Sequence, residues 1–367
     1  MSVYEIDLSA CRGRQQRLLE RMRELKLDAV IVTKAENVHW LGGQRFGWFF
    51  QAGAALRADG HLTIAAPAKP PVEAAVDEVV TYEAQWHATL RNDQWQTCMK
   101  ALYDAIRKDV EGRRIGIEYS TKGICETETS NQVVDIEPLM YELRRKKEAD
   151  ELARIKKAIA GTEKMYERAR EIIRPGVTEI EVFNELQAAA VREFGEMLTG
   201  TGNDYQCGSR GGPPRNDRSA EAGELYILDL GPAFRGYFAD NCRTIAVTEP
   251  SDAQQEAWSY VMKVFDHVEA TVKPGKNAKE LFEEAQAILD EAPVGVFNHH
   301  LGHGIGLFPH EAPHLNPNWN DTFEEGEVFT AEPGLYAPEL KAGMRIENNY
   351  VVTADGVEKL TLFPLEL

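Results

Sequence analysis

The chain has 367 residues, 43% of them hydrophobic, and a formal net charge of −18 at pH 7. This length predicts two domains of ~150 residues each, and the acidic balance argues against nucleic-acid binding through a basic surface. Because no run of ~18 apolar residues occurs, we expect no membrane span.

The cysteines and the first residues indicate the compartment. The five cysteines are odd in number and lack CxxC spacing, which argues against a disulfide framework or a zinc knuckle. The start, residues 1–7, lacks the basic and apolar regions of a secretory signal. We therefore expect a cytoplasmic protein with free thiols.

Helix and strand patterns alternate in the first part of the chain. An amphipathic helix is expected at 13–26, with strands at 27–33 and 61–66, and a helix at 92–110 precedes a strand at 114–118. This alternation predicts an α/β domain over residues 1–145. A charged helix over 142–172 then begins a second domain, residues 146–367.

An internal repeat lies within the second domain. Residues 173–187 match residues 272–286, with Pro, Gly, Phe, Glu and Gln recurring at a period of 99 residues. Each copy predicts a turn that leads into a helix whose Phe faces inward. Helix starts resemble one another by chance, but the match also fits two related halves.

Two pairs of acidic residues lie in short runs rich in glycine and β-formers. Asp229 and Asp240 flank a turn at Pro232 and Arg235-Gly236, which predicts a hairpin. If it folds about its midpoint, the two are direct cross-strand partners with Cβ atoms ~4.5–5.5 Å apart. Carboxylates that close repel each other unless a cation lies between them.

The second pair, Glu332 and Glu347, becomes opposed when the chain folds about Glu339-Leu340, unless a bulge intervenes. His303 adds an imidazole from the run Gly302-His-Gly-Ile-Gly306. Four carboxylates and one imidazole suit two metal ions that share ligands, as in two-metal hydrolytic sites. Oxygen-rich ligation favours Mn²⁺, with Co²⁺, Fe²⁺ or Zn²⁺ as alternatives because of the histidine.

The stretch His310-Glu-Ala-Pro-His314 matches the HExxH zinc motif as text. That motif needs a helix to bring both histidines to one face. Pro309 and Pro313 disfavour a continuous helix here, so we reject the zinc-protease interpretation.

The order Asp, a second Asp eleven positions later, then Gly-His-Gly, Glu-Pro-Gly and Arg-Ile-Glu resembles the pita-bread metallopeptidases, which include aminopeptidase P, prolidase, methionine aminopeptidase and creatinase. The resemblance covers nearly the whole chain. It implies a creatinase/prolidase-like α/β amino-terminal domain and an α+β pita-bread catalytic domain with a pseudo-twofold repeat. It also implies a homodimer in which each active site borders the partner's amino-terminal domain.

The resemblance also implies residue roles. Asp240 and Glu347 would bridge the metals, Asp229 would complete one ion, and His303 and Glu332 would complete the other. Glu332 is the implied general base. His299 and His310 match positions that steady the tetrahedral intermediate or the substrate carbonyl. Arg345 matches a position that pairs with a substrate carboxylate or with nearby acids.

Three positions either depart from the family pattern or have two possible roles. Proline-processing members carry Pro-His in the loop before the first ligand strand, where this chain has Arg215 by motif or Gly212 by spacing. His300 replaces the usual glycine and is either structural or an addition to the site. Trp48, in the aromatic run 46–50, is either a core residue or a substrate-shaping contact in the neighbouring subunit's pocket.

The leading hypothesis is a dinuclear metallohydrolase that cleaves Xaa-Pro peptides, as a dipeptidase or an aminopeptidase. The altered loop and the aromatic run keep open a non-peptidase enzyme on the same scaffold, either a creatinase-like C–N hydrolase or a metal-dependent lyase. A binding protein without catalysis is the third hypothesis, and the intact ligand set argues against it. Small peptides or small molecules are the expected substrates, with no nucleic-acid or membrane partner.

Overall fold

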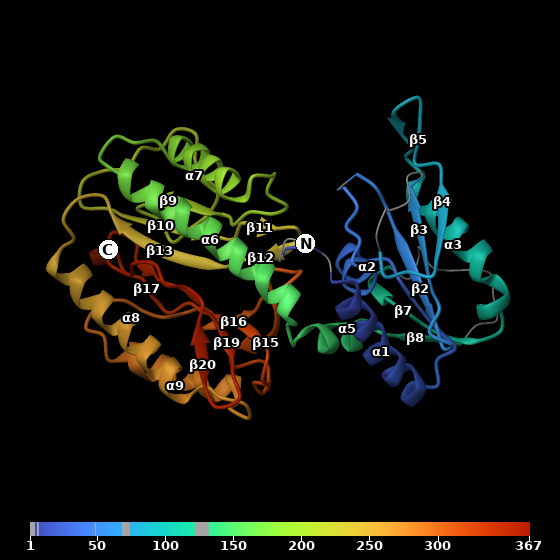
Figure 1. Cartoon of the computed structure of the whole chain (residues 1–367). Helices are drawn as coiled ribbons and strands as arrows, with labels where there is room; N and C mark the ends of the chain where they lie inside the picture. The colour runs from blue at the N-terminus through green and yellow to red at the C-terminus, as the bar shows by residue number, and fades with distance from the viewer. Residues whose placement is uncertain (1–3, 6, 48, 68–73, 122–131) are drawn as a thin grey trace. The chain divides into compact units, whose positions relative to one another are not determined.

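The computed structural model describes residues 4–5, 7–47, 49–67, 74–121 and 132–367 (Figure 1). Trp48 and Cys125 lie outside the described residues. The chain divides into two compact units, residues 1–144 and 145–367. Within the described part of the chain, no helix has both the length and the apolar character that crossing a membrane requires.

The first unit is built on a six-stranded mixed sheet of order β4-β3-β2-β1-β7-β8. Its strands are β1 (Ala29–Val32), β2 (Gly53–Arg57), β3 (Leu62–Pro67), β4 (Glu78–Tyr82), β7 (Arg114–Ile117) and β8 (Gln132–Asp135). The short strands β5 (Gln85–Trp86) and β6 (Thr89–Leu90) form a separate ribbon. The predicted α/β architecture of this unit is therefore confirmed.

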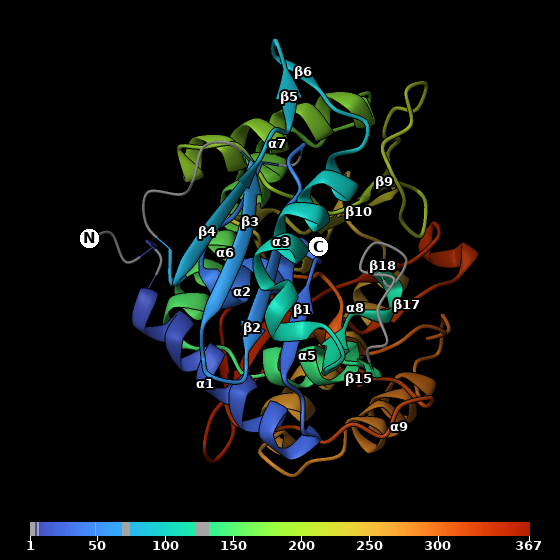
Figure 2. The same ribbon diagram turned by 90° about the vertical axis from the view of Figure 1, so that its right-hand side faces the viewer.

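Helix α3 (Gln94–Val110) lies along this sheet (Figure 2) and buries Leu102 and Ile106 in a shared core. Helix α1 (Leu8–Leu25) begins earlier than the predicted 13–26, because the Asp7 carboxylate caps the free N–H groups of Ser9 and Ala10. A short helix, α2 (Ala35–Gly42), follows β1.

The single helix predicted over 142–172 is wrong. Two helices occur instead, α5 (Glu137–Arg144) and α6 (Ala149–Ile172). Between them, Lys146 forms an isolated β-bridge with Glu327, and the Lys147 N–H donates to Gly326 O at 2.8 Å. The Glu148 backbone then starts α6 through a capping box with Glu151. Long-range backbone hydrogen bonds therefore override the local helical preference.

The second unit places two helix pairs around small antiparallel sheets (Figure 1). Helix α6 packs on α7 (Glu179–Phe194), and α8 (Asp252–Thr271) packs on α9 (Ala278–Asp290). The three-stranded sheet has the order β13-β10-β9 and the five-stranded sheet β15-β14-β16-β19-β20. Their strands are β9 (Asp204–Cys207), β10 (Leu225–Leu230), β13 (Asn241–Ala246), β14 (Gly302–Gly304), β15 (Glu311–Leu315), β16 (Val328–Ala331), β19 (Asn348–Val352) and β20 (Val357–Lys359).

The repeat predicted from the sequence is present in the structure. Thr178 caps the start of α7 and Asn277 caps the start of α9, at positions 99 residues apart like the motif itself. Gly176 and Gly275 make equivalent turns, with φ of 90° and 92°. The repeated phenylalanines, Phe183 and Phe282, are only half-buried, because neighbouring apolar residues take the innermost positions of each helix.

The hairpin that carries the aspartates differs from the prediction. Asp229 pairs with Cys242 and Leu230 with Asn241, so Asp229 and Asp240 are not direct partners. The tip, formed by β11 (Ala233–Phe234) and β12 (Tyr237–Phe238), turns at Arg235-Gly236, both with positive φ. Such a two-residue turn fixes the register. The shift is one full pleat period, so Asp229 and Asp240 become diagonal neighbours on one face.

Glu332 and Glu347 do lie opposite each other, as predicted. Ala331 pairs with Asn348 on one side of them. On the other side, β17 (Gly334–Leu335) pairs with β18 (Met344–Arg345), Gly334 against Arg345. Both ladders have the same register, so the two glutamates occupy one cross-strand position without a bulge.

Candidate metal centre

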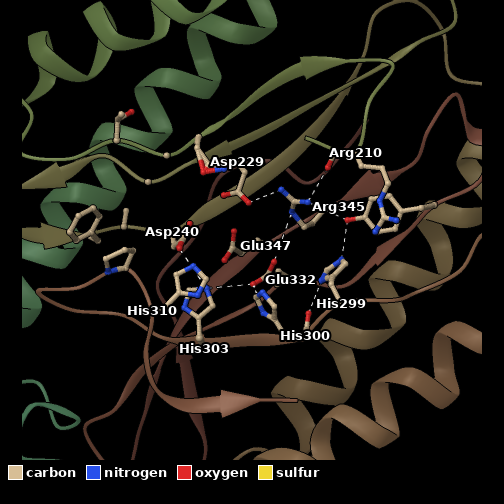
Figure 3. Close-up of a pocket in the computed structure, with 18 residues that line it drawn as sticks. Arg210, Asp229, Asp240, His299, His300, His303, His310, Glu332, Arg345 and Glu347 are labelled. Carbon is tan, nitrogen blue, oxygen red and sulfur yellow. Dashed lines mark hydrogen bonds and ion pairs between the residues drawn. The ribbon is translucent and has the colours of Figure 1, made fainter. Parts of the chain in front are cut away.

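A cavity of about 390 Å³ opens in the second unit and is lined by acids and imidazoles (Figure 3). The five predicted ligands all line it: Asp229, Asp240, His303, Glu332 and Glu347. Also on its wall are His299, His300, His310, Arg345, Tyr336 and Arg210. The tertiary structure thus brings the five predicted ligands together from five different strands or strand ends.

The two carboxylate ribbons meet through the backbone. The Glu347 N–H donates to Cys242 O at 2.9 Å, and the Glu332 N–H donates to Leu301 O at 2.7 Å. Neither N–H bonds across its own ribbon, although the neighbouring Ile346 N–H donates to Pro333 O at 3.2 Å. This arrangement joins the aspartate ribbon to Glu347 and the strand of His303 to Glu332.

The ligand atoms lie close enough together to share metal ions. His303 Nε2 is 3.7 Å from Asp240 Oδ2 and 3.6 Å from Glu332 Oε1. Carboxylate oxygens of Asp229, Asp240 and Glu347 lie within 4.8 Å of one another. The ring Nδ1–H of His303 faces Gly304 O at 3.1 Å, which leaves Nε2 for a metal.

The surroundings of the Glu347 carboxylate show whether these residues fit divalent cations. Its Oε2 atom is buried and has no hydrogen-bond partner among the described residues. A buried carboxylate oxygen without a partner is costly unless a cation compensates it. The orphaned oxygen and its anionic neighbours therefore fit a metal-binding function.

The pKa values of three acids show that the buried centre disfavours several negative charges close together. Burial, with the nearby Glu332 and Asp204 charges, raises the pKa of Asp229 to about 6 despite Arg345. Burial and neighbouring carboxylates raise the pKa values of Asp240 and Glu347 well above their usual range. Cations in the centre would reverse these shifts.

Glu332 behaves differently from the other three acids. Burial alone would raise its pKa, but the adjacent histidines, His300 first, outweigh that effect and lower it to about 2. His300 Nδ1 lies 3.1 Å from Glu332 Oε1. Glu332 is therefore the acid of the centre that ionises most readily.

Of the two predicted substrate-facing histidines, His299 is largely enclosed. Burial lowers its pKa to about 4, so the ring is neutral at pH 7. Its Nδ1–H donates to His300 O at 2.7 Å, and its Nε2 accepts from the Tyr336 hydroxyl at 2.9 Å. Both ring nitrogens of His299 are therefore engaged with protein groups.

His310 is exposed and stacks on His303, with ring centroids 3.8 Å apart. Its neighbours Glu311 to Leu315 form strand β15, so the residues that match the HExxH pattern lie on a strand and not on a helix. The rejection of the zinc-protease motif is therefore confirmed.

Arg345 pairs with acids of the pocket wall. Its Nη2 contacts Asp204, and it donates to Asp229 Oδ2 at 2.7 Å. Of the two roles implied for this position, the structure shows the pairing with nearby acids. Asp204, which the sequence reasoning missed, carries no motif and is brought here by β9 alone.

Arg215 does not line the cavity. Its Nη2 donates to the fully buried Glu179 at 2.6 Å and to Cys207 O at 2.8 Å, which places the guanidinium in a structural ion pair. The same loop supplies Arg210 to the cavity instead. The signal for this residue was its position in the altered loop, five residues before Arg215.

Arg210 is held by neutral groups. Its guanidinium lies 4.0 Å above the Tyr336 ring and donates to Asn298 Oδ1 at 2.5 Å. Among the described residues, no carboxylate lies within ion-pair distance of it. Figure 3 shows Arg210 next to Arg345, on the opposite side of the labelled group from His310. The cavity therefore has an uncompensated cation at one side of its acidic centre.

Comparisons with known proteins agree with this geometry. The model of metallopeptidase family M24 matches residues 153–354, and that of the creatinase/prolidase N-terminal domain matches residues 14–146. An uncharacterized peptidase of Staphylococcus aureus (strain USA300) is 30% identical over 355 residues, covering 94% of this chain and 97% of the relative.

Solved structures extend the likeness to both units. The prolidase from Pyrococcus furiosus is 27% identical with a TM-score of 0.79, covering 94% of this chain and 99% of that one. The Xaa-Pro dipeptidase from Bacillus anthracis is 25% identical with a TM-score of 0.82, covering 97% and 99%.

Proposed function

Because the chain belongs to metallopeptidase family M24, we propose that it is a dinuclear metal-dependent peptidase that cleaves Xaa-Pro bonds. The observation that carries the proposal is the convergence of four carboxylates and His303 on one cavity around the orphaned Glu347 oxygen. The prolidase and the Xaa-Pro dipeptidase among the similar structures support the substrate class.

We assign the ligands as the family resemblance implies. Asp229, Asp240 and Glu347 would hold one ion, and His303 and Glu332 would complete the second, with Asp240 and Glu347 shared. Manganese is the proposed metal, because oxygen donors dominate the set. Bound divalent ions would polarise the scissile carbonyl and lower the pKa of an attacking water.

Three side chains of the protein are proposed to transfer protons or to orient the substrate and its neighbours. Glu332, whose carboxylate ionises readily, is proposed to accept the proton of the attacking water and to deliver it to the leaving nitrogen. His310, exposed at the cavity wall, is proposed to donate to the substrate carbonyl oxygen. His299 holds the Tyr336 hydroxyl in place through Nε2.

Arg210 is proposed to bind the carboxylate of the substrate. Arg345 already pairs with two acids, whereas Arg210 faces the cavity with neutral partners only. A cavity of about 390 Å³ is at the small end of the ~300–1,000 Å³ range for ligand pockets. We therefore propose a dipeptidase preference, with the free C-terminal carboxylate on Arg210.

The test is turnover by the Mn²⁺-loaded full-length chain on Xaa-Pro dipeptides, the matching dipeptide amides and Xaa-Pro tripeptides. Dipeptide cleavage well above a Glu332→Gln control is expected, with two metal ions per chain by elemental analysis. Absence of turnover above that control on every substrate, with metal bound, would remove the peptidase proposal and leave a non-peptidase reaction on this scaffold.

We also propose a homodimer, because of the resemblance to the creatinase and prolidase branch. A cytoplasmic location is proposed on the free thiols of Cys11, Cys98, Cys207 and Cys242. Sedimentation of the purified chain tests the first proposal, and cell fractionation tests the second.

A further inference from the structure

His300 lies on the wall of the metal centre, at a position where the proposed function assigns it no role. We propose that His300 is an additional metal ligand, which binds the same ion as His303 and Glu332. The inference rests on the proposed dinuclear centre and adds a second imidazole to one half of it.

The separations between donor atoms carry the proposal. His300 Nδ1 and His303 Nε2 lie 3.1 and 3.6 Å from the same oxygen, Glu332 Oε1. One ligand atom from each of the three residues fits within 4.8 Å of the others. Nitrogen and oxygen donors at ~2.1 Å from an ion are ~3.0–3.4 Å apart at octahedral or tetrahedral angles. The distances of the two ring nitrogens from Glu332 Oε1 are therefore close to those within one coordination shell.

The surroundings of the His300 Nδ1 atom also support a role as a metal ligand. Its Nδ1 atom is buried, and apart from the 3.1 Å contact with Glu332 Oε1 it has no polar partner among the described residues. The His300 carbonyl oxygen accepts from His299 Nδ1 at 2.7 Å, which fixes the backbone that carries the ring. A buried nitrogen whose one close partner is a buried carboxylate oxygen fits a position where a cation binds both atoms.

The ring orientations favour His300 over His310 as the extra ligand. His310 stacks nearly parallel on His303, with an interplanar angle of 16°, so the lone pairs of the two rings run side by side. His300 is tilted by 53° to His303, with centroids 5.5 Å apart. Tilted rings can direct their nitrogens at a common point between them, as Figure 3 shows around Glu332.

A second imidazole would change which metal the centre prefers. Carboxylate-rich sites suit Mn²⁺, whereas imidazole ligands favour Co²⁺, Zn²⁺ and Fe²⁺. We therefore expect the ratio of Co²⁺ affinity to Mn²⁺ affinity to be higher for the wild-type chain than for a variant without His300.

The experiment measures metal binding directly. The full-length chain, stripped of metal, is titrated with Co²⁺ and separately with Mn²⁺ by calorimetry, and the visible absorption of the Co²⁺ form is recorded. The variants are His300→Gln and His300→Gly. The control is His267→Gln, whose ring pairs with Glu284 away from the cavity. Thermal unfolding of each metal-free variant checks that it folds.

Two Co²⁺ ions per chain are expected for wild type and for His267→Gln. For the His300 variants we expect at least ~10-fold weaker binding of one Co²⁺, since even indirect partners of metal ligands contribute ~10–100-fold. The same variants should lose less affinity for Mn²⁺ than for Co²⁺, and the visible absorption spectrum of their Co²⁺ form should change. Wild-type affinity and an unchanged spectrum in folded His300 variants would overturn the proposal and leave only an ion pair with Glu332.

Peptidase assays on the same samples separate this inference from the proposed function. Weakened Co²⁺ binding without any Xaa-Pro turnover would support the ligand and reject the peptidase. Xaa-Pro turnover with metal binding unaffected by the His300 substitutions would support the peptidase and reject the ligand.

Discussion

Glu332 lies directly opposite Glu347 at the point where the hydrogen bonds of their ribbon are interrupted. The strands pair in the same register on both sides of this point. Each glutamate N–H donates to a different segment, Leu301 for Glu332 and Cys242 for Glu347. The backbone therefore holds two carboxylates face to face while linking them to the strands of the remaining ligands.

Glu332→Gln keeps the size of the side chain and removes its charge. We expect turnover of Xaa-Pro substrates to fall by ~10²–10⁴-fold, the range typical of a lost general acid–base group. Steady-state kinetics with metal analysis on the same sample measures the effect. Glu324→Gln, at an exposed pair with Lys146, is the matched control. A Glu332→Gln rate close to wild type would contradict the assigned role.

The metal-free chain should lose stability as the pH rises. Folding raises the pKa of Asp229 from 3.8 to about 6 and those of Asp240 and Glu347 further above their usual range. Through these three acids the folded state binds more protons than the unfolded state from about pH 4 upward, so their contribution to the free energy of unfolding falls with rising pH. Burial lowers the pKa values of His299 to about 4 and of His303 to about 3, so these two groups oppose the trend below pH 6.5 and leave it unopposed above that. Thermal unfolding in chelator at pH 5 and pH 7.5 measures this.

Added Mn²⁺ should reverse the trend, because divalent ions bind the ionised carboxylates. The rise in Tm on adding metal should therefore be larger at pH 7.5 than at pH 5. An equal rise at both values would argue that these acids are not the ligands.

Arg210→Gln should weaken recognition of a free C-terminal carboxylate. A charge-assisted hydrogen bond contributes ~1.5–3 kcal/mol, or ~10–100-fold, so kcat/KM for dipeptides should fall by about that factor through a higher KM. Rates on dipeptide amides should stay nearly constant. Arg168→Gln, on the α6 surface with Glu171 and Glu185, is the control. Equal losses on dipeptides and amides would assign Arg210 a structural role.

Arg215→Gln should affect stability instead of substrate recognition. It removes the ionic partner of Glu179, which is fully buried and also accepts the backbone N–H groups of Cys207 and Arg215. Loss of a partner from a buried pair costs ~3–5 kcal/mol, and the exposure of the Arg215 side chain reduces this to about 2 kcal/mol. Urea unfolding measures the loss. A raised KM in a variant of unchanged stability would show instead that Arg215 reaches substrate.

The five residues that meet at the cavity, the 99-residue repeat and the Glu332–Glu347 register could be predicted from the sequence alone. Each depends on local spacing: the pleat alternates every two residues, and helix caps recur at fixed distances from the turns that precede them. The absence of a helix around 310–314 followed from Pro309 and Pro313, whereas the strand β15 found there was not predicted.

Other features were decided only by the tertiary structure. The Arg235-Gly236 turn shifted the aspartate ribbon by two residues, and contacts with Gly326 and Glu327 broke the helix predicted over 142–172. Likewise, buried Glu179 captured Arg215, which left Arg210 at the cavity. These outcomes depend on partners distant in sequence, whose competition for one hydrogen bond or one charge is settled only when the chain is folded.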